Sequence, residues 1–140
     1  MTKYVIIDVM LTFEQHSKRS GYHAFVLSDE SRKKLLDAHP PTHPEVVTHH
    51  ITHKFPAKHT DNLPEHPKSV KVIGHAKEDG LEAFAVEVDG KTHRPDGSHY
   101  HITHSLDRSK GKKPVHSNQL INKGYTKIDP IEIHTTSKFV

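Results

Sequence analysis

The sequence predicts an α+β protein, built mainly on antiparallel β-sheet with one or two helices. Short runs of β-branched and aromatic residues recur along the chain, as is typical of strands. Turn dipeptides, among them Asp79-Gly80 and Asp89-Gly90, lie between neighbouring runs, and turns of this kind join antiparallel strands in hairpins. A length of 140 residues is that of one domain, so we expect a single domain over residues 1–140.

Each element follows from local signals, taken in the order of the chain. The runs of strand-forming residues are 4–11, 22–27, 45–55, 70–75, 81–88, 98–106 and 125–134. Ser28 is a suitable cap for a helix over 29–38, which opens on two acidic residues and ends before two prolines. A shorter helix begins within 117–122 and ends at Gly124. Pro130 interrupts the last run, which places that strand at an edge of the sheet.

Composition excludes several functional classes. No apolar run approaches the roughly 18 residues of a membrane span, and no signal peptide is recognised, so we expect a cytoplasmic protein without a membrane partner. Cysteine is absent, which excludes disulfide scaffolds, thiolate zinc sites and cysteine nucleophiles. The net charge of +3 suits phosphate-bearing ligands but does not by itself indicate nucleic-acid binding. Histidine is the outlier, with 16 residues, and its imidazole suits acid–base chemistry near neutral pH.

One tetrapeptide, His-Ile-Thr-His, occurs twice, with its copies 51 residues apart. Both copies fall in predicted strands, where successive side chains point to opposite faces. His50 and Thr52 therefore share a face of the first strand, and His101 and Thr103 share a face of the second. If the two strands are neighbours, two imidazoles and two hydroxyls converge on one groove.

Such a groove suits the cleavage of a phosphodiester. One imidazole takes a proton from the attacking water or hydroxyl, while the other donates a proton to the leaving oxygen. The threonine hydroxyls can donate hydrogen bonds to the nonbridging phosphate oxygens. This chemistry needs no metal and no other cofactor. His50 and His53 point to opposite faces, which disfavours a metal site built from the tetrapeptide alone.

The two H-x-T motifs resemble those of the two-histidine (2H) phosphoesterase superfamily, and the resemblance covers most of the chain, from residue 21 to 133. It includes the segment GYHAFVL at 21–27, before the first motif, and KPVHSNQL at 113–120, after the second. The latter is similar to the cyclic phosphodiesterase domain of fungal-type tRNA ligases. It is also similar to phage-borne relatives that destroy cyclic oligonucleotide messengers and so blunt bacterial immunity.

This resemblance implies a two-lobed fold with a pseudo-twofold axis and metal-independent hydrolysis of cyclic ribonucleotide phosphodiesters. It implies two substrate classes: RNA ends or nucleotides with a 2′,3′-cyclic phosphate, as in RNA repair, and cyclic oligonucleotide signals. His50 and His101 match the acid–base pair of the family, and Thr52 and Thr103 match its phosphate-binding residues. Which histidine is the acid and which the base stays open.

The chain departs from the family at the fourth motif position, which is usually apolar. Here His53 and His104 occupy it, on the face of each strand that points away from the groove. We therefore expect no change in the chemistry, although two polar residues must then be accommodated behind the groove.

Five further residues are candidate substrate contacts: Tyr22, Arg94, His99, Lys110 and Lys112. Ser117 and Asn118 are interpreted as helix-capping residues. Two other functions stay open. The protein could be a nucleotide- or RNA-binding module without catalysis. It could also be a histidine-rich metal-binding protein, since His99 and His101 have the spacing of a metal-ligand pair on a strand.

Overall fold

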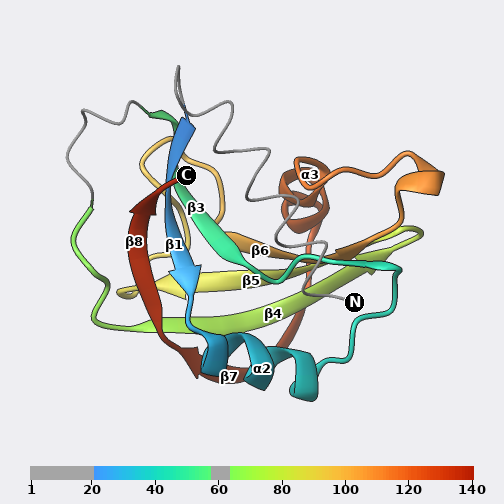
Figure 1. Cartoon of the computed structure of the whole chain (residues 1–140), viewed down its shortest axis with the longest axis horizontal. Helices are drawn as coiled ribbons and strands as arrows, with labels where there is room; N and C mark the ends of the chain where they lie inside the picture. Colours follow the sequence, from blue (N-terminus) through green and yellow to red (C-terminus); the bar gives the residue numbers. More distant parts are fainter. Residues whose placement is uncertain (1–20, 58–63) are drawn as a thin grey trace.

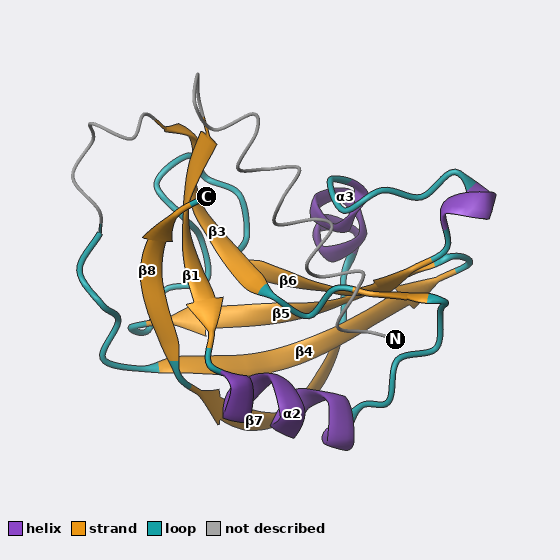
Figure 2. Cartoon of the chain, in the orientation of Figure 1, coloured by secondary structure: helices purple, strands orange, loops and turns teal. Residues whose placement is uncertain are grey.

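A computed structural model describes residues 21–57 and 64–140, and within these ranges eight strands form one antiparallel sheet with two α-helices beside it (Figures 1 and 2). The strands are β1 (Gly21–Leu27), β2 (Glu45–Val46), β3 (His50–Ala57), β4 (Val70–Glu78), β5 (Leu81–Val88), β6 (His101–Leu106), β7 (Thr126–Ile133) and β8 (Thr135–Phe139). The helices are α2 (Asp29–Ala38), the short 3₁₀-helix η1 (Arg108–Lys110) and α3 (His116–Lys123). The predicted α+β class with mainly antiparallel sheet is confirmed.

The strand order is β7-β4-β5-β6-β3-β1-β8, with the two-residue strand β2 also paired to β6. The edge strands β7 and β8 are consecutive in the chain, with His134 between them. One continuous stretch of backbone therefore supplies both edges, and the sheet curls to accommodate it (Figure 1). The edge position predicted from Pro130 is confirmed, because β7 pairs only with β4 in the described residues.

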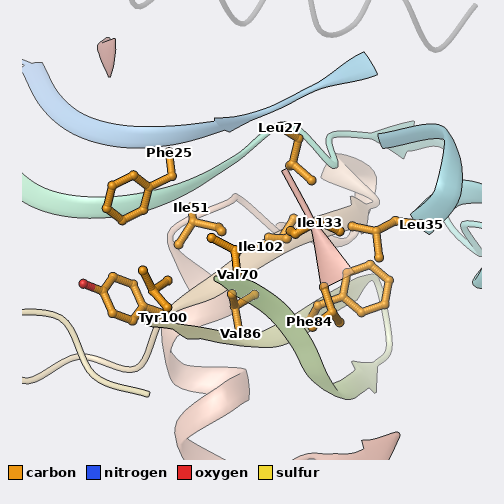
Figure 3. Close-up of a cluster of buried hydrophobic side chains, with 12 residues drawn as sticks. Phe25, Leu27, Leu35, Ile51, Val70, Phe84, Val86, Tyr100, Ile102 and Ile133 are labelled. Atoms are coloured by element: carbon orange, nitrogen blue, oxygen red, sulfur yellow. The ribbon is translucent and has the colours of Figure 1, made fainter. Parts of the chain in front are cut away.

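The main apolar core fills the inside of the curl (Figure 3). Phe25, Ile51, Phe84 and Ile102 come from four different strands, and helix α2 adds Leu35, which is fully buried. Truncation of a side chain like Leu35 to alanine costs about 2–5 kcal/mol of stability, because it removes apolar contact and leaves a cavity.

Helix α3 covers the other face of the sheet. Its Leu120 and Ile121 pack with Ala83 and Ala85 of β5. Successive side chains of a strand point to opposite faces, so these two alanines point away from the main core, toward which their neighbours in β5 point. The two helices therefore lie on opposite faces, and α3 is the one that lies against β4, β5 and β6. Among the described residues, neither α-helix has the length and apolar character that a membrane crossing requires.

Local signals determine the boundaries of the first helix. The Ser28 hydroxyl accepts a hydrogen bond from the Ser31 N–H at 3.1 Å, and the His39 N–H closes the last turn on the Leu35 carbonyl. The two prolines that follow cannot extend the helix. The predicted bounds of 29–38 are confirmed, and the predicted end of the second helix at Gly124 is confirmed as well.

The predicted strand over 45–55 was wrong in one respect, because it is two strands separated at Thr48. This buried residue has a positive φ of 41°, and its hydroxyl contacts Nδ1 of His104 at 2.7 Å. A side-chain hydrogen bond here stabilises a backbone conformation that a strand does not allow.

Three further strands differ from the prediction or lie outside the described residues. The strand predicted over 98–106 begins only at His101, and the strand β8 was not predicted. The strand predicted over 4–11 lies outside the described residues.

Candidate active site

Strands β3 and β6 are neighbours in the sheet, and Ile51 of the first tetrapeptide lies opposite Ile102 of the second. Both isoleucines are fully buried in the main core. The flanking histidine and threonine of each motif therefore point to the other face of the sheet, the face that α3 covers.

Six of the nine residues predicted to act on or contact the substrate line one pocket on that face, with a volume of about 240 Å³. They are Tyr22, His50, Thr52, Arg94, His101 and Thr103. The two imidazoles and the two hydroxyls of the motifs therefore face the same pocket.

Both ring nitrogens of His50 have partners. Nε2 lies 3.2 Å from the Tyr22 hydroxyl, and Nδ1 lies 3.0 Å from Nδ1 of His49. Burial, reinforced by the imidazoles of His49 and His101, lowers the pKa of His50 to about 3. Burial also raises the pKa of Tyr22, so its phenol keeps its proton. His50 is therefore neutral at neutral pH, and Tyr22 can donate a hydrogen bond to its Nε2.

His101 has a different arrangement. Its Nδ1–H donates to the backbone carbonyl of His99 at 3.1 Å, which leaves Nε2 as the nitrogen that can contact a ligand. Burial lowers the pKa of His101, but the hydrogen bond to the His99 carbonyl opposes that shift, since it favours the charged imidazolium. The two imidazoles of the pocket thus differ in how readily they hold a second proton.

Thr103 is connected to the first turn of α3. Its hydroxyl lies 2.8 Å from the Ser117 hydroxyl and 3.3 Å from the Pro114 carbonyl. The Pro114 carbonyl can only accept, so Thr103 donates its single proton there and accepts from Ser117, and to donate to a phosphate it must turn that proton away from the Pro114 carbonyl. The role in helix capping assigned to Ser117 from the sequence was wrong, because the N-cap of α3 is Val115, which makes no side-chain capping bond.

Arg94 brings a positive charge to the pocket. Its Nε donates to Oδ1 of Asp96 at 2.9 Å, within the turn that precedes β6, and its side chain is mostly buried. A guanidinium has five N–H donors in a planar fork, so the bond to Asp96 is compatible with donation to an anion in the pocket.

The other three candidate substrate contacts do not line this pocket. The ring of buried His99 contacts the Tyr100 carbonyl and the Tyr125 hydroxyl instead. Lys110 forms an ion pair with Asp79, and Lys112 forms one with Glu78 at 2.7 Å, both at the β4–β5 hairpin. These long-range pairs are not visible from the spacing of the lysines along the chain.

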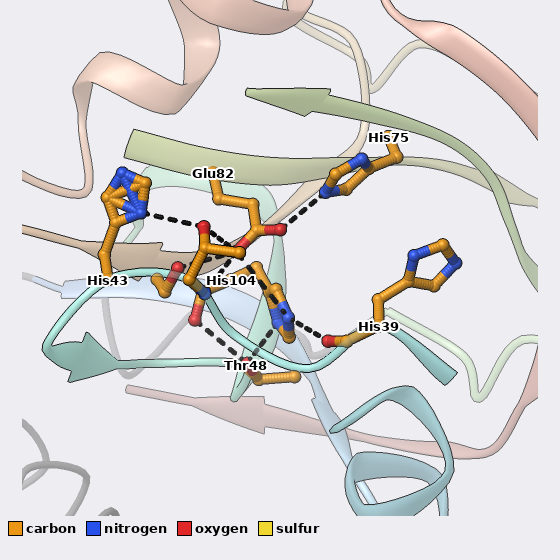
Figure 4. Close-up of polar contacts among 8 residues, drawn as sticks. His39, His43, Thr48, His75, Glu82 and His104 are labelled. Carbon is orange, nitrogen blue, oxygen red and sulfur yellow. Dashed lines mark hydrogen bonds and ion pairs between the residues drawn. The ribbon is translucent and has the colours of Figure 1, made fainter. Parts of the chain in front are cut away.

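The two histidines at the fourth motif position lie away from the pocket and are hydrogen-bonded. His53 contacts the Tyr100 hydroxyl through Nδ1 at 2.8 Å. His104 is fully buried, and its Nε2–H donates to the His39 carbonyl at 2.7 Å (Figure 4). Burial lowers the pKa of His104 to about 4, so it is neutral at neutral pH. The polar residues behind the groove are thus paired with neighbouring polar groups.

A buried carboxylate lies next to His104. Glu82 accepts hydrogen bonds from His75 and Ser105, each at 2.7 Å, and from Thr42 at 3.2 Å (Figure 4). Burial alone would raise the pKa of Glu82, but these hydrogen bonds and the neighbouring imidazole of His104 lower it to about 2. The network stabilises the loop that precedes β2.

Within residues 21–57 and 64–140, no three side chains of the metal-ligating types gather in a way that could hold a metal ion. Comparison with protein-family models, with curated proteins and with solved structures finds no match for this chain. The function proposed below is therefore argued from the chemistry and the geometry of the pocket.

Proposed function

We propose that this chain is a phosphodiesterase that hydrolyses cyclic ribonucleotide phosphodiesters, with His50 and His101 as its acid–base pair. The proposal includes the pseudo-twofold, two-lobed fold of the 2H phosphoesterases, whose axis would pass between β3 and β6. One observation carries it: two H-x-T motifs on adjacent antiparallel strands place two imidazoles, two hydroxyls and Arg94 around one pocket. We expect this activity in the cytoplasm.

The environments of the two imidazoles support different roles for them. His50 is held neutral and can accept a proton, so it is the general base. His101 presents a proton at Nε2 only as an imidazolium, which the His99 carbonyl favours, so it is the general acid. An anionic phosphate bound beside Arg94 would raise the pKa of His101 and so supply the proton where it is needed.

The reaction then follows from these positions. His50 takes a proton from water, and the water oxygen forms a bond to phosphorus. The bond from phosphorus to the leaving ribose oxygen breaks, and His101 gives its proton to that oxygen. Hydrogen bonds from Thr52, Thr103 and the Arg94 guanidinium stabilise the charge that develops on the nonbridging oxygens. Exchange with solvent returns one proton from His50 and restores one to His101.

The size of the pocket bears on the substrate. Its volume of about 240 Å³ is below the roughly 300–1,000 Å³ of pockets that enclose drug-sized ligands. It can enclose the phosphate and part of the attached nucleoside, as in a nucleoside 2′,3′-cyclic phosphate or an RNA end with such a group. A cyclic oligonucleotide would place one phosphodiester in the pocket and the rest of its ring outside.

The test is turnover in excess chelator of nucleoside 2′,3′-cyclic phosphates, short RNA with a cyclic end, and cyclic di- and trinucleotides. We expect His50→Ala and His101→Ala each to lower the rate by about 10²–10⁴-fold, the range for loss of a general acid or base. His66→Ala, at an exposed histidine outside the pocket, is the matched control. We expect Thr52→Ala and Thr103→Ala to cost less.

The outcomes separate this function from its alternatives. Nucleotide binding that survives both histidine substitutions, with no turnover by the parent protein, would favour a binding module. Activity that chelator abolishes and zinc restores would favour the other alternative, a histidine-rich metal-binding protein.

A further inference from the structure

The residues that line the pocket include an apolar group besides the histidines, the threonines and Arg94. Val47, Pro114 and Val115 form an apolar wall, and Asn118 lies among them. The Val115 side chain is 69% exposed, and no other large hydrophobic side chain in the described part of the chain is exposed. A single exposed valine is ordinary on a protein surface, but this one stands at the rim of a pocket.

Asn118 provides the polar group of this wall. Its Oδ1 is buried and has no hydrogen-bond partner in the structure. A buried acceptor without a donor is unusual in a folded protein, and it is relieved when a ligand brings an N–H group. The residue lies in the first turn of α3 and is one of those that line the pocket.

The apolar wall and the phosphate end are joined through α3. Thr103 contacts Ser117 and the Pro114 carbonyl, and these residues are the neighbours of Asn118 and Val115 in the chain. A ligand whose phosphate lies against Thr103 is therefore held near Asn118. In a ribonucleotide the phosphate is attached to the ribose, and the ribose carries a flat base whose edge has hydrogen-bonding atoms.

We propose that Val47, Pro114, Val115 and Asn118 form an adenine-binding subsite, an inference that rests on the proposed phosphodiesterase function and names its preferred substrate. The apolar side chains contact the faces of the base. The 6-amino group of adenine donates to the unpartnered Oδ1 of Asn118, and the Nδ2 amide donates to N7, the pairing that asparagine makes with adenine. A base with a carbonyl at that position places oxygen against Oδ1 and is rejected.

The closest test compares adenosine and inosine 2′,3′-cyclic phosphates, since these differ at the 6-position of the base, which has an amino group in one and a carbonyl in the other. We expect the parent protein to have a kcat/KM for the adenosine compound at least about tenfold above that for the inosine compound. In Asn118→Leu, which keeps the volume and removes both polar groups, we expect the ratio to fall to about one. Gln119→Leu, at the exposed neighbour on the same helix, should leave the ratio unchanged.

Equal use of the two substrates by the parent protein would overturn the adenine subsite while leaving the phosphodiesterase function intact. So would a ratio that Asn118→Leu does not change. Asn118→Ala serves as a second variant, and the thermal midpoint of each variant shows whether it is folded.

Failure of the phosphodiesterase function itself would appear as no cleavage of either compound by the parent protein. If the parent protein cleaves neither compound, calorimetric titration with adenosine and inosine 2′-monophosphates still tests the subsite. Tighter binding of the adenosine nucleotide, lost in Asn118→Leu, supports it. Equal binding of the two, or binding of neither, overturns it.

Discussion

The phenolic oxygen of Tyr22 lies 3.2 Å from Nε2 of His50, the nitrogen to which we assign the base function. The tyrosine is buried and keeps its proton, so it can stabilise the neutral form of the imidazole. In the free protein it therefore occupies the position that the attacking water must take. Tyr22 thus helps to determine the pKa of the base and the cost of bringing water to it.

Tyr22→Phe removes the donor that stabilises neutral His50, so the pKa of His50 should rise from its value of about 3. A base works only while it is neutral, and the rate is lost as the pH falls through its pKa. We therefore expect the acid limb of the kcat/KM profile to move to higher pH in this variant. Tyr100→Phe, whose hydroxyl contacts His53 outside the pocket, is the matched control. An acid limb that stays in place would contradict the assignment.

The pH profile of the parent protein should be bell-shaped, with its maximum below pH 6.5, the ordinary pKa of histidine. Burial lowers the pKa of both His50 and His101, so at neutral pH the free protein holds too little of the imidazolium that the acid role requires. As the pH rises, kcat/KM therefore falls. The acid limb lies near the pKa of His50, about 3. Initial rates over about pH 2–8 therefore cover both limbs, and a flat profile would refute two-histidine catalysis.

Ser117→Ala should weaken catalysis through Thr103. Without the Ser117 hydroxyl, Thr103 loses the 2.8 Å contact in which it accepts a hydrogen bond, and with it the group that orients its own O–H, now donated to the Pro114 carbonyl, for transfer to a phosphate. We expect kcat/KM to fall about three- to tenfold, the size of one ordinary hydrogen bond. In a Thr103→Val background the same substitution should have no further effect on the rate. Equal losses in both backgrounds would mean that Ser117 acts only on the stability of α3.

Glu82→Gln should change how stability depends on pH. The folded-state pKa of Glu82 is lowered to about 2, so the ionised carboxylate stabilises the fold above its ordinary pKa of 4.5 and this contribution is lost as the pH falls from 4.5 to about 2. The expected difference in unfolding free energy between the parent and the variant is on the order of 2–3 kcal/mol above pH 4.5.

Urea unfolding at a series of pH values measures this difference. Glu87→Gln, on the same strand β5, is the control and should follow the parent protein. Buried His104 acts in the same direction, since its pKa is lowered from 6.5 to about 4 and the unfolded chain binds its proton first. A difference between parent and Glu82→Gln that is independent of pH would show that the carboxylate is not ionised in the fold.

Much of the architecture could be predicted from local signals. The capping of α2 by Ser28, the hairpin turn at Gly80 and the edge position that Pro130 imposes each depend on a few neighbouring residues. The alternation of side chains along two strands was enough to group His50 with Thr52 and His101 with Thr103. Period-two geometry holds wherever the strand exists, so the grouping needs no tertiary information.

The rest of the candidate site depends on contacts between distant segments. Ser117 and Asn118 approach the pocket because α3 packs across β5 and β6, which no spacing in the chain reveals. The place of Lys110 and Lys112 away from the pocket could not be predicted for the same reason, since their carboxylate partners lie at the β4–β5 hairpin. An unpartnered amide oxygen, such as that of Asn118, becomes visible only when its surroundings are known.

The interruption at Thr48 has a consequence for how this site can vary. Val46 pairs with Ser105, and Ile51 pairs with Ile102. Between these two pairs lie four residues, 47–50, on the side of β2 and β3, but only two residues, 103 and 104, on β6. The register of the first motif is held instead by β1, where Val26 lies opposite His50 and Phe25 opposite Ile51, and by the burial of Ile51. The irregular segment 47–49 can therefore take up an inserted residue without turning His50 away from the pocket. The interval between the two tetrapeptides is thus free to vary at this segment, whereas a shift of one residue within β3 would exchange its pocket face with its core face.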